Sequence, residues 1–81
     1  MPEVRLWGSL SALAEDEKRI TVEAKDIREL FRKLAERYPA LRGALESDVA
    51  VSIDGVVYRD NWSKELPEEA EIFLMRRLTG G

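Results

Sequence analysis

The chain has 81 residues, enough for one small domain, which removes only about 60% of its unfolded surface from water and needs a well-patterned core. Its 13 Lys and Arg against 16 Asp and Glu residues give a formal net charge of −3, which argues against a general nucleic-acid binder. Cysteine and histidine are absent, which excludes a disulfide framework, a thiolate zinc site and the commonest general base. Neither a membrane span nor a signal-peptide pattern is present, so we expect a cytoplasmic protein without a membrane partner.

Two stretches near the N-terminus alternate between apolar and polar residues, as half-buried strands do. They cover residues 4–7 and 19–23. The segment between them, residues 9–17, is predicted to be a connection from which Leu10 and Leu13 reach the core.

A helix is the clearest predicted element. Asp26 is a suitable N-cap, and Glu29, three residues later, is expected to reach back to it as in a capping box. One apolar stripe at helical spacing follows, formed by Ile27, Leu30, Phe31, Leu34, Ala35 and Tyr38. The opposite face is charged and is predicted to be solvated. Pro39 ends the helix, because the residue before a proline disfavours helical geometry.

Three further strands are predicted after the helix, at residues 49–53, 56–58 and 71–75. Asp54-Gly55 supplies the positive φ angles of a tight hairpin turn, and residues 66–70 form another turn. The order is ββαβββ. Since one helix covers only one face of a sheet, we predict an α+β fold with a mixed sheet packed on one main helix, which acts as the crossover between parallel strands.

The last strand also predicts an interaction surface. If Ile72 and Leu74 face the core, alternation places Phe73 and Met75 on the other face, where Trp7 extends the same patch. A register reversed by one residue would exchange the two faces. The second tryptophan, Trp62, falls in a loop and is expected to cover an edge of the core.

These elements, taken in order with the final Gly80-Gly81, resemble the β-grasp sulfur carriers of the MoaD/ThiS family, relatives of ubiquitin. The likeness extends over nearly the whole chain and is carried by residues 4–7 with 10–14, 26–30 with 34–41, 49–55, and 70–74 followed by Gly80-Gly81. The length and the Tyr38-Pro39 helix exit most resemble the small subunit of molybdopterin synthase. The resemblance implies a ubiquitin-like β-grasp domain at residues 1–75 and a flexible C-terminal tail at residues 76–81.

The resemblance also implies a chemistry for the tail. In similar proteins a ubiquitin-activating-like enzyme uses ATP and magnesium to adenylate the terminal glycine, here Gly81, and sulfur then replaces AMP to give a thiocarboxylate. The expected partners are that adenylating enzyme and the large subunit of molybdopterin synthase. The chain itself is then a carrier, not an enzyme, and binds no cofactor or metal. The residues expected to contact partners are Phe73, Met75, Arg76, Arg77, Leu78, Thr79 and Gly80.

Glycine suits such a tail because it has no side chain to obstruct a narrow channel and adopts any extended conformation the channel requires. Arg76 and Arg77 stand where the small-subunit pattern often has two prolines, and make the tail similar to that of ubiquitin. They could pair with acidic groups in a partner's channel or serve only solubility. Asp54 replaces a common asparagine, which leaves the turn intact.

Three functions therefore remain open. The first is a sulfur carrier in molybdopterin synthesis. The second shares the activation step but serves thiamine synthesis, tRNA thiolation or conjugation to lysine as a ubiquitin-like modifier. The third is a β-grasp interaction module whose glycine end is an incidental frayed terminus.

Overall fold

The chain folds into a five-stranded mixed sheet with its main helix on one face, as the sequence predicts. A computed structural model describes residues 2–47 and 49–76. The elements are β1 (Glu3–Leu6), α1 (Ser9–Leu13), β2 (Arg19–Thr21), α2 (Ile27–Arg37), η1 (Pro39–Leu41), α3 (Arg42–Ser47), β3 (Val49–Ile53), β4 (Val56–Tyr58) and β5 (Glu71–Arg76).

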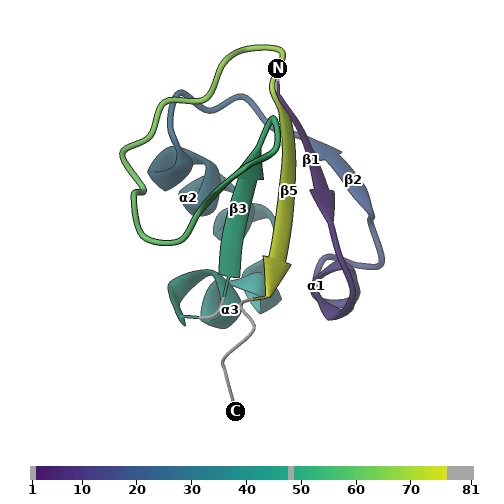
Figure 1. Cartoon of the computed structure of the whole chain (residues 1–81). Helices are drawn as coiled ribbons and strands as arrows, with labels where there is room; N and C mark the ends of the chain where they lie inside the picture. The colour runs from purple at the N-terminus through teal and green to yellow at the C-terminus, as the bar shows by residue number, and fades with distance from the viewer. Residues whose placement is uncertain (1, 48, 77–81) are drawn as a thin grey trace.

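The strand order in the sheet is β2-β1-β5-β3-β4, so the first and last strands of the chain lie side by side in its centre (Figure 1). Strand β1 runs parallel to β5, with Val4 opposite Ile72 and Leu6 opposite Leu74. The other pairs, β1–β2, β3–β4 and β3–β5, are antiparallel. The N-terminus and the carboxyl end of β5 therefore lie at opposite ends of the sheet.

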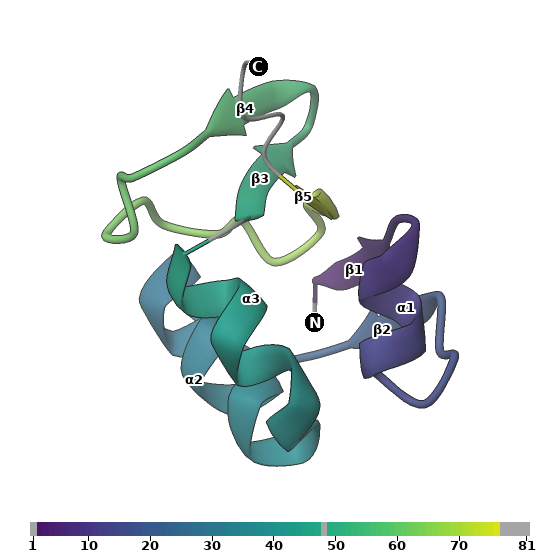
Figure 2. The same cartoon turned by 90° about the horizontal axis from the view of Figure 1, so that it is seen from below.

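Helices α2 and α3 lie on one side of the sheet, as the view from below shows (Figure 2). The core between the two layers contains side chains that are completely buried, among them Val4, Leu10, Ile27, Leu30, Leu34, Leu41, Val51, Ile72 and Leu74. Leu13 packs against this core from α1, so both leucines predicted to reach the core do so. On the opposite face of the sheet, residues 2–47 and 49–76 place no helix. We call it the open face.

The N-terminus of α2 is fixed by a cap and by the long β4–β5 loop. The Asp26 carboxylate accepts a hydrogen bond from the Glu29 amide at 2.8 Å, as predicted. The Glu29 carboxylate reaches past Asp26 and accepts from the Lys25 amide at 2.9 Å, one residue earlier than a standard capping box. In the loop, the Trp62 carbonyl accepts from the Arg28 amide at 2.9 Å.

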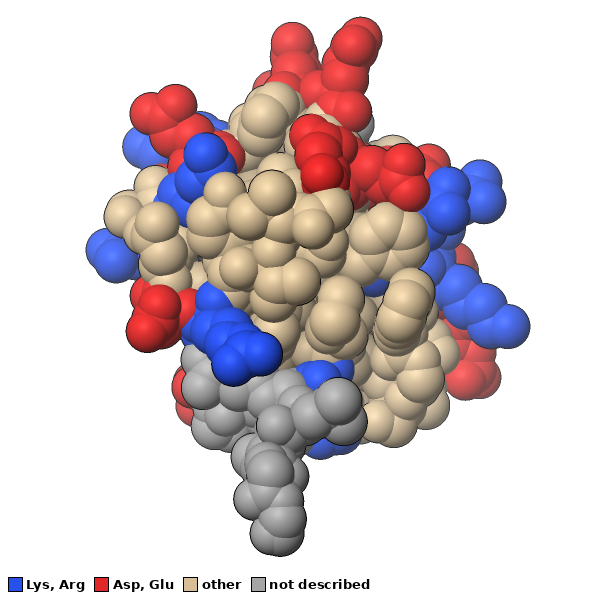
Figure 3. All heavy atoms as spheres, viewed as in Figure 1, with Lys and Arg blue, Asp and Glu red and all other residues tan. Residues whose placement is uncertain are grey.

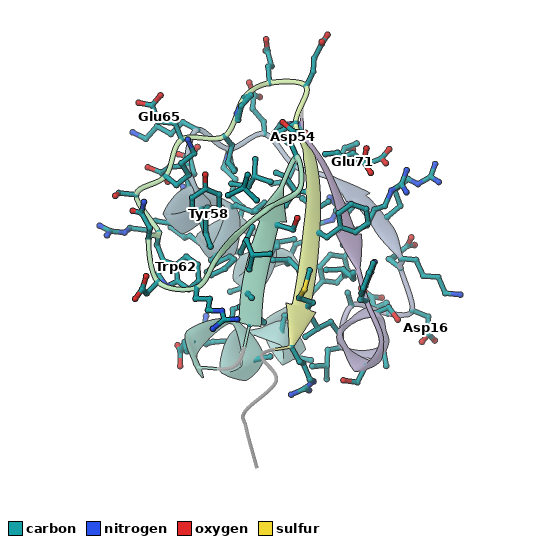
Figure 4. All side chains as sticks on the ribbon, viewed as in Figure 1. Asp16, Asp54, Tyr58, Trp62, Glu65 and Glu71 are labelled. Carbon is teal, nitrogen blue, oxygen red and sulfur yellow. The ribbon has the colours of Figure 1, made fainter. Side chains whose placement is uncertain are left out.

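The same loop covers an edge of the core. The Trp62 ring meets the Phe31 ring of α2 edge-on, with centroids 4.9 Å apart, and packs against the core cluster, which confirms its predicted place (Figure 4). The loop thus supplies both backbone acceptors and apolar cover to one side of α2.

The β3–β4 turn has the predicted geometry. Asp54 has φ 48° and Gly55 φ 91°, which matches the positive angles that a two-residue hairpin turn requires. Asp54 also joins the turn to β5, because its carboxylate accepts from the Glu71 amide and its own amide donates to the Glu71 carbonyl, both at 3.0 Å (Figure 4).

Three short helical segments differ from the prediction. The segment predicted as a connection contains α1, and η1 and α3 follow the main helix, where Leu41, Ala44 and Leu45 enter the core. Helix α1 has only five residues and begins after Gly8 without a side-chain cap, so neither apolar periodicity nor a capping residue predicts it. At the strand ends, β2 stops at Thr21 and β5 continues to Arg76, one residue beyond the predicted domain boundary.

Candidate functional site: the open face and the end of β5

Strand β5 divides its side chains between the core and the open face as the sequence predicts. Ile72 and Leu74 are fully buried, whereas Phe73 and Met75 are half-buried on the other side of the strand. The alternative register, shifted by one residue, is therefore excluded. Of the predicted partner contacts, Phe73, Met75 and Arg76 belong to the described part of the chain. Arg77, Leu78, Thr79, Gly80 and Gly81 lie outside the described residues.

Uncharged side chains from four segments gather around Phe73 and Met75. Cross-strand pairing puts Ser52 beside Phe73 and Ala50 beside Met75, and Val57 of β4 lies next to Ser52. We call this group the open-face patch, formed by Trp7, Ala50, Ser52, Val57, Phe73 and Met75. In space-filling view, uncharged surface extends over the strands and most charged side chains lie around it (Figure 3).

Trp7 is the most exposed large apolar residue of the patch, with 56% of its surface accessible, and Val57 follows at 50%. The Trp7 ring meets the Phe73 ring edge-on with centroids 5.6 Å apart, so the predicted extension of the patch to Trp7 is correct. Ala50 and Ser52 are small and buried although none of the helices that the structure describes covers this face, so their larger neighbours provide the exposed apolar surface of the patch.

The end of β5 is tied to the segment that follows β1. The Trp7 amide donates to the Leu74 carbonyl at 3.1 Å, and the Arg76 Nε–H donates to the Ser9 hydroxyl at 2.6 Å. The predicted boundary made Arg76 the first tail residue, but it is the last residue of β5 and is anchored to α1. The patch and the point where the chain leaves the sheet are consequently held in a fixed relation.

One charged group on the open face was missed by the sequence analysis. Arg5 of β1 lies opposite Phe73, with its guanidinium carbon 5.6 Å from the centroid of that ring. Its Nε–H donates to the Glu3 carboxylate at 3.2 Å, and Arg19 of β2 approaches the same oxygen at 3.6 Å. The alternation of residues 3, 5 and 7 already put them on one face; what the sequence lacked was the strand order that brings β1 beside β5.

Other kinds of site are not formed by the described residues. Within residues 2–47 and 49–76, no group of three or more acidic side chains could hold a metal ion. Over the same residues, no helix has the length and apolar character needed to cross a membrane.

Comparisons with known proteins agree on the fold. No protein-family model matches the sequence, and no curated protein sequence matches it significantly. Among solved structures, CysO of Mycobacterium tuberculosis, described as an antigen, superposes with a TM-score of 0.83 at 8% identity, over 96% of this chain and 100% of that one. The small archaeal modifier protein 1 of Methanosarcina acetivorans gives 0.79 at 19% identity, over 99% and 95%.

A third structure is a complex of subunits 1 and 2 of the molybdopterin-converting factor of Helicobacter pylori, with a TM-score of 0.69 at 25% identity, over 99% of this chain and 97% of that one. The element order, the parallel central strands and these likenesses define the class: the chain is a ubiquitin-like β-grasp protein. Within that class it resembles the MoaD/ThiS type, as the sequence predicts.

Proposed function

We propose that this protein is a sulfur carrier whose C-terminal carboxylate is the working group. The observation that supports the proposal best is the position of the open-face patch, which reaches the carboxyl end of β5 at Arg76. A partner that covers Phe73 and Met75 would therefore also lie beside Arg76, the last described residue before the C-terminal segment. Binding of the partner to the patch would then also bring the C-terminus to the partner's active site.

The proposed chemistry takes place in partner enzymes, in two steps. A Gly81 carboxylate oxygen attacks the α-phosphorus of ATP, with magnesium bound to the nucleotide, and displaces pyrophosphate to form an acyl adenylate. Hydrosulfide held non-covalently by the enzyme then attacks the carbonyl carbon, the C–O bond to AMP breaks, and loss of the S–H proton leaves a thiocarboxylate. In this scheme the chain supplies the docking surface and the reacting carboxylate, and it is a substrate.

The proposed acceptor is the large subunit of molybdopterin synthase. Support comes from the solved complex of subunits 1 and 2 of the molybdopterin-converting factor, whose first subunit this chain resembles at 25% identity. A second candidate, a ubiquitin-like modifier joined to lysine, is supported by the likeness to the archaeal modifier protein and by an arginine, Arg76, at the end of β5.

Intact mass spectrometry of the protein from its native host tests the proposal. A mature chain that ends at Gly81 and carries one oxygen-for-sulfur exchange supports the carrier, whereas lysine adducts ending in Gly81 support the modifier. Finding neither, together with no ATP–pyrophosphate exchange by the adenylating enzyme of the same organism, would refute both.

A deletion variant refines the test. Removing Gly80 and Gly81 should abolish exchange while leaving the thermal unfolding curve unchanged, because the core is built from residues that precede Arg76. Glu68→Ala is a control: it changes an exposed residue of the β4–β5 loop, keeps the diglycine and is expected to remain a substrate.

A further inference from the structure

Arg5 is a cation at the border of the open-face patch, between Phe73 of β5 and the charged residues Glu3 and Arg19. It is paired with Phe73 on one side and Arg19 on the other, and its side chain remains 41% exposed. Its guanidinium lies over the Phe73 ring at 5.6 Å, an arrangement in which a cation is attracted by the negative face of the ring. A partner that covers Phe73 must therefore also cover Arg5.

The carboxylate beside Arg5 is shared with a second guanidinium group. The Glu3 carboxylate is shared, at 3.2 Å from Arg5 Nε and 3.6 Å from Arg19 Nε. Two guanidinium groups thus share the Glu3 carboxylate, and Glu71, opposite Glu3 on β5, adds a second carboxylate to the same end of the open face. A guanidinium has five N–H donors in a planar fork, and the hydrogen bond to Glu3 uses the one at Nε.

The fold itself gains little from this arrangement. Ion pairs between partly exposed side chains contribute little to stability, and Glu3 and Arg5 both remain open to water. Glu3 and Phe73 nevertheless hold the guanidinium from two sides. The geometry is that of a pre-oriented contact group, because little side-chain freedom remains to be lost when a ligand binds it.

We propose that Arg5 is a specificity-determining residue of the docking surface and pairs with a carboxylate on the apolar surface of the activating enzyme. This inference rests on the proposed function. Covering Arg5 without an opposing carboxylate would take from water the N–H donors that Glu3 does not use, so an apolar surface lacking that carboxylate is disfavoured. A protein carboxylate fits better than a nucleic-acid phosphate backbone, since the chain is acidic overall and Glu3 lies beside Arg5.

The test uses the full chain and the purified adenylating enzyme of the same organism, with ATP–pyrophosphate exchange measured against chain concentration. Arg5→Gln should raise KM about 10-fold and leave kcat unchanged, because a docking contact acts on association and not on the chemistry at Gly81. Arg5→Lys keeps the charge but loses the planar fork of donors, so its KM should lie between the values of Arg5→Gln and the wild type.

Arg19→Gln is the matched control, since it also removes a partner of Glu3 but lies one strand further from the patch; its KM should change less than about 3-fold. Raising the NaCl concentration should increase KM more steeply for the wild type than for Arg5→Gln, because one screened charge pair is missing in the variant. All assays are run where circular dichroism shows every variant folded.

The outcomes separate the two proposals. If the wild-type chain supports no exchange, the proposed function fails, and the role of Arg5 in activation fails with it. If the wild type is active and the Gly80-Gly81 deletion is not, while Arg5→Gln keeps the wild-type KM and salt dependence, the inference about Arg5 alone is overturned. An equal rise in KM for Arg19→Gln would overturn it too, since the effect would then be one of general charge.

Discussion

Two neighbouring residues of β5 allow the roles of the two sheet faces to be separated by experiment. Ile72 is fully buried between Val4 of β1 and Ile53 of β3, whereas Phe73 is half-buried on the open face. We predict that Ile72→Ala mainly destabilises the fold and that Phe73→Ala mainly weakens docking.

The magnitudes follow from burial. Truncating a fully buried isoleucine to alanine costs about 2–5 kcal/mol, because transfer and cavity terms add, and the central position of Ile72 favours the upper half of that range. Phe73 leaves no enclosed cavity; losing part of its burial and its edge-on contact with Trp7 should cost about 1–2 kcal/mol. A domain of this size has a total stability of roughly 4–12 kcal/mol, so the first change consumes a large part of it.

Urea unfolding monitored by circular dichroism measures both free energies, with the slope m required to stay constant between variants. Ile72→Ala should also lower Tm by at least about 10 °C, since each kcal/mol corresponds to roughly 4–8 °C in a domain of this length. In the exchange assay the variant with the larger effect should be the other one. Phe73→Ala should raise KM, whereas Ile72→Ala should keep a KM near the wild-type value at a temperature where this variant is folded.

Equal destabilisation in the two variants would refute this division of roles between the two faces of the sheet. That result would mean that the open face is covered in the folded protein in solution, and that Phe73 is a core residue. An unchanged KM for Phe73→Ala in an active system would refute the docking role separately.

Three further predictions concern local structure. Asp26→Ala should cost about 1 kcal/mol in urea unfolding through loss of the α2 cap, while Asp26→Ser should restore most of it. Asp54→Ala should cost about 2 kcal/mol, because it loses the bond to the Glu71 amide and strains a φ of 48°, whereas Asp54→Asn should change the unfolding free energy by less than about 0.5 kcal/mol. Trp62→Ala should speed hydrogen exchange at the Arg28 amide, which donates to the Trp62 carbonyl; unchanged exchange there would show that the side chain does not hold the loop on α2.

The features of the fold that can be predicted from this sequence are those that local residue patterns determine. The apolar stripe of α2, the Asp54-Gly55 turn and the alternation of β5 each depend on residues close together in the chain, and each agrees with the structure. The short helices α1, η1 and α3 escaped prediction because segments of three to six residues owe their helical form to burial of Leu10, Leu41 and Leu45 in the tertiary core.

The residues of the candidate site also differ in whether a local pattern predicts them. Phe73, Met75 and Trp7 were found because alternation along one strand sufficed. Arg5 was missed because its importance depends on the pairing of β1 with β5, two strands separated by almost the whole chain. Its contact with Phe73 is a property of strand order, which no local pattern in this sequence encodes.

The central place of β5 also has a mechanical consequence. Strand β5 is bonded along its length to β1 on one side and β3 on the other, and β1 carries the N-terminus at the opposite end of the sheet (Figure 1). A pull on the C-terminus against the N-terminus therefore loads the row of hydrogen bonds between the parallel strands β1 and β5 in shear, so that these bonds resist together and do not open one at a time. The strand that would carry the force from a bound partner, β5, is thus the strand that is hydrogen-bonded on both of its edges.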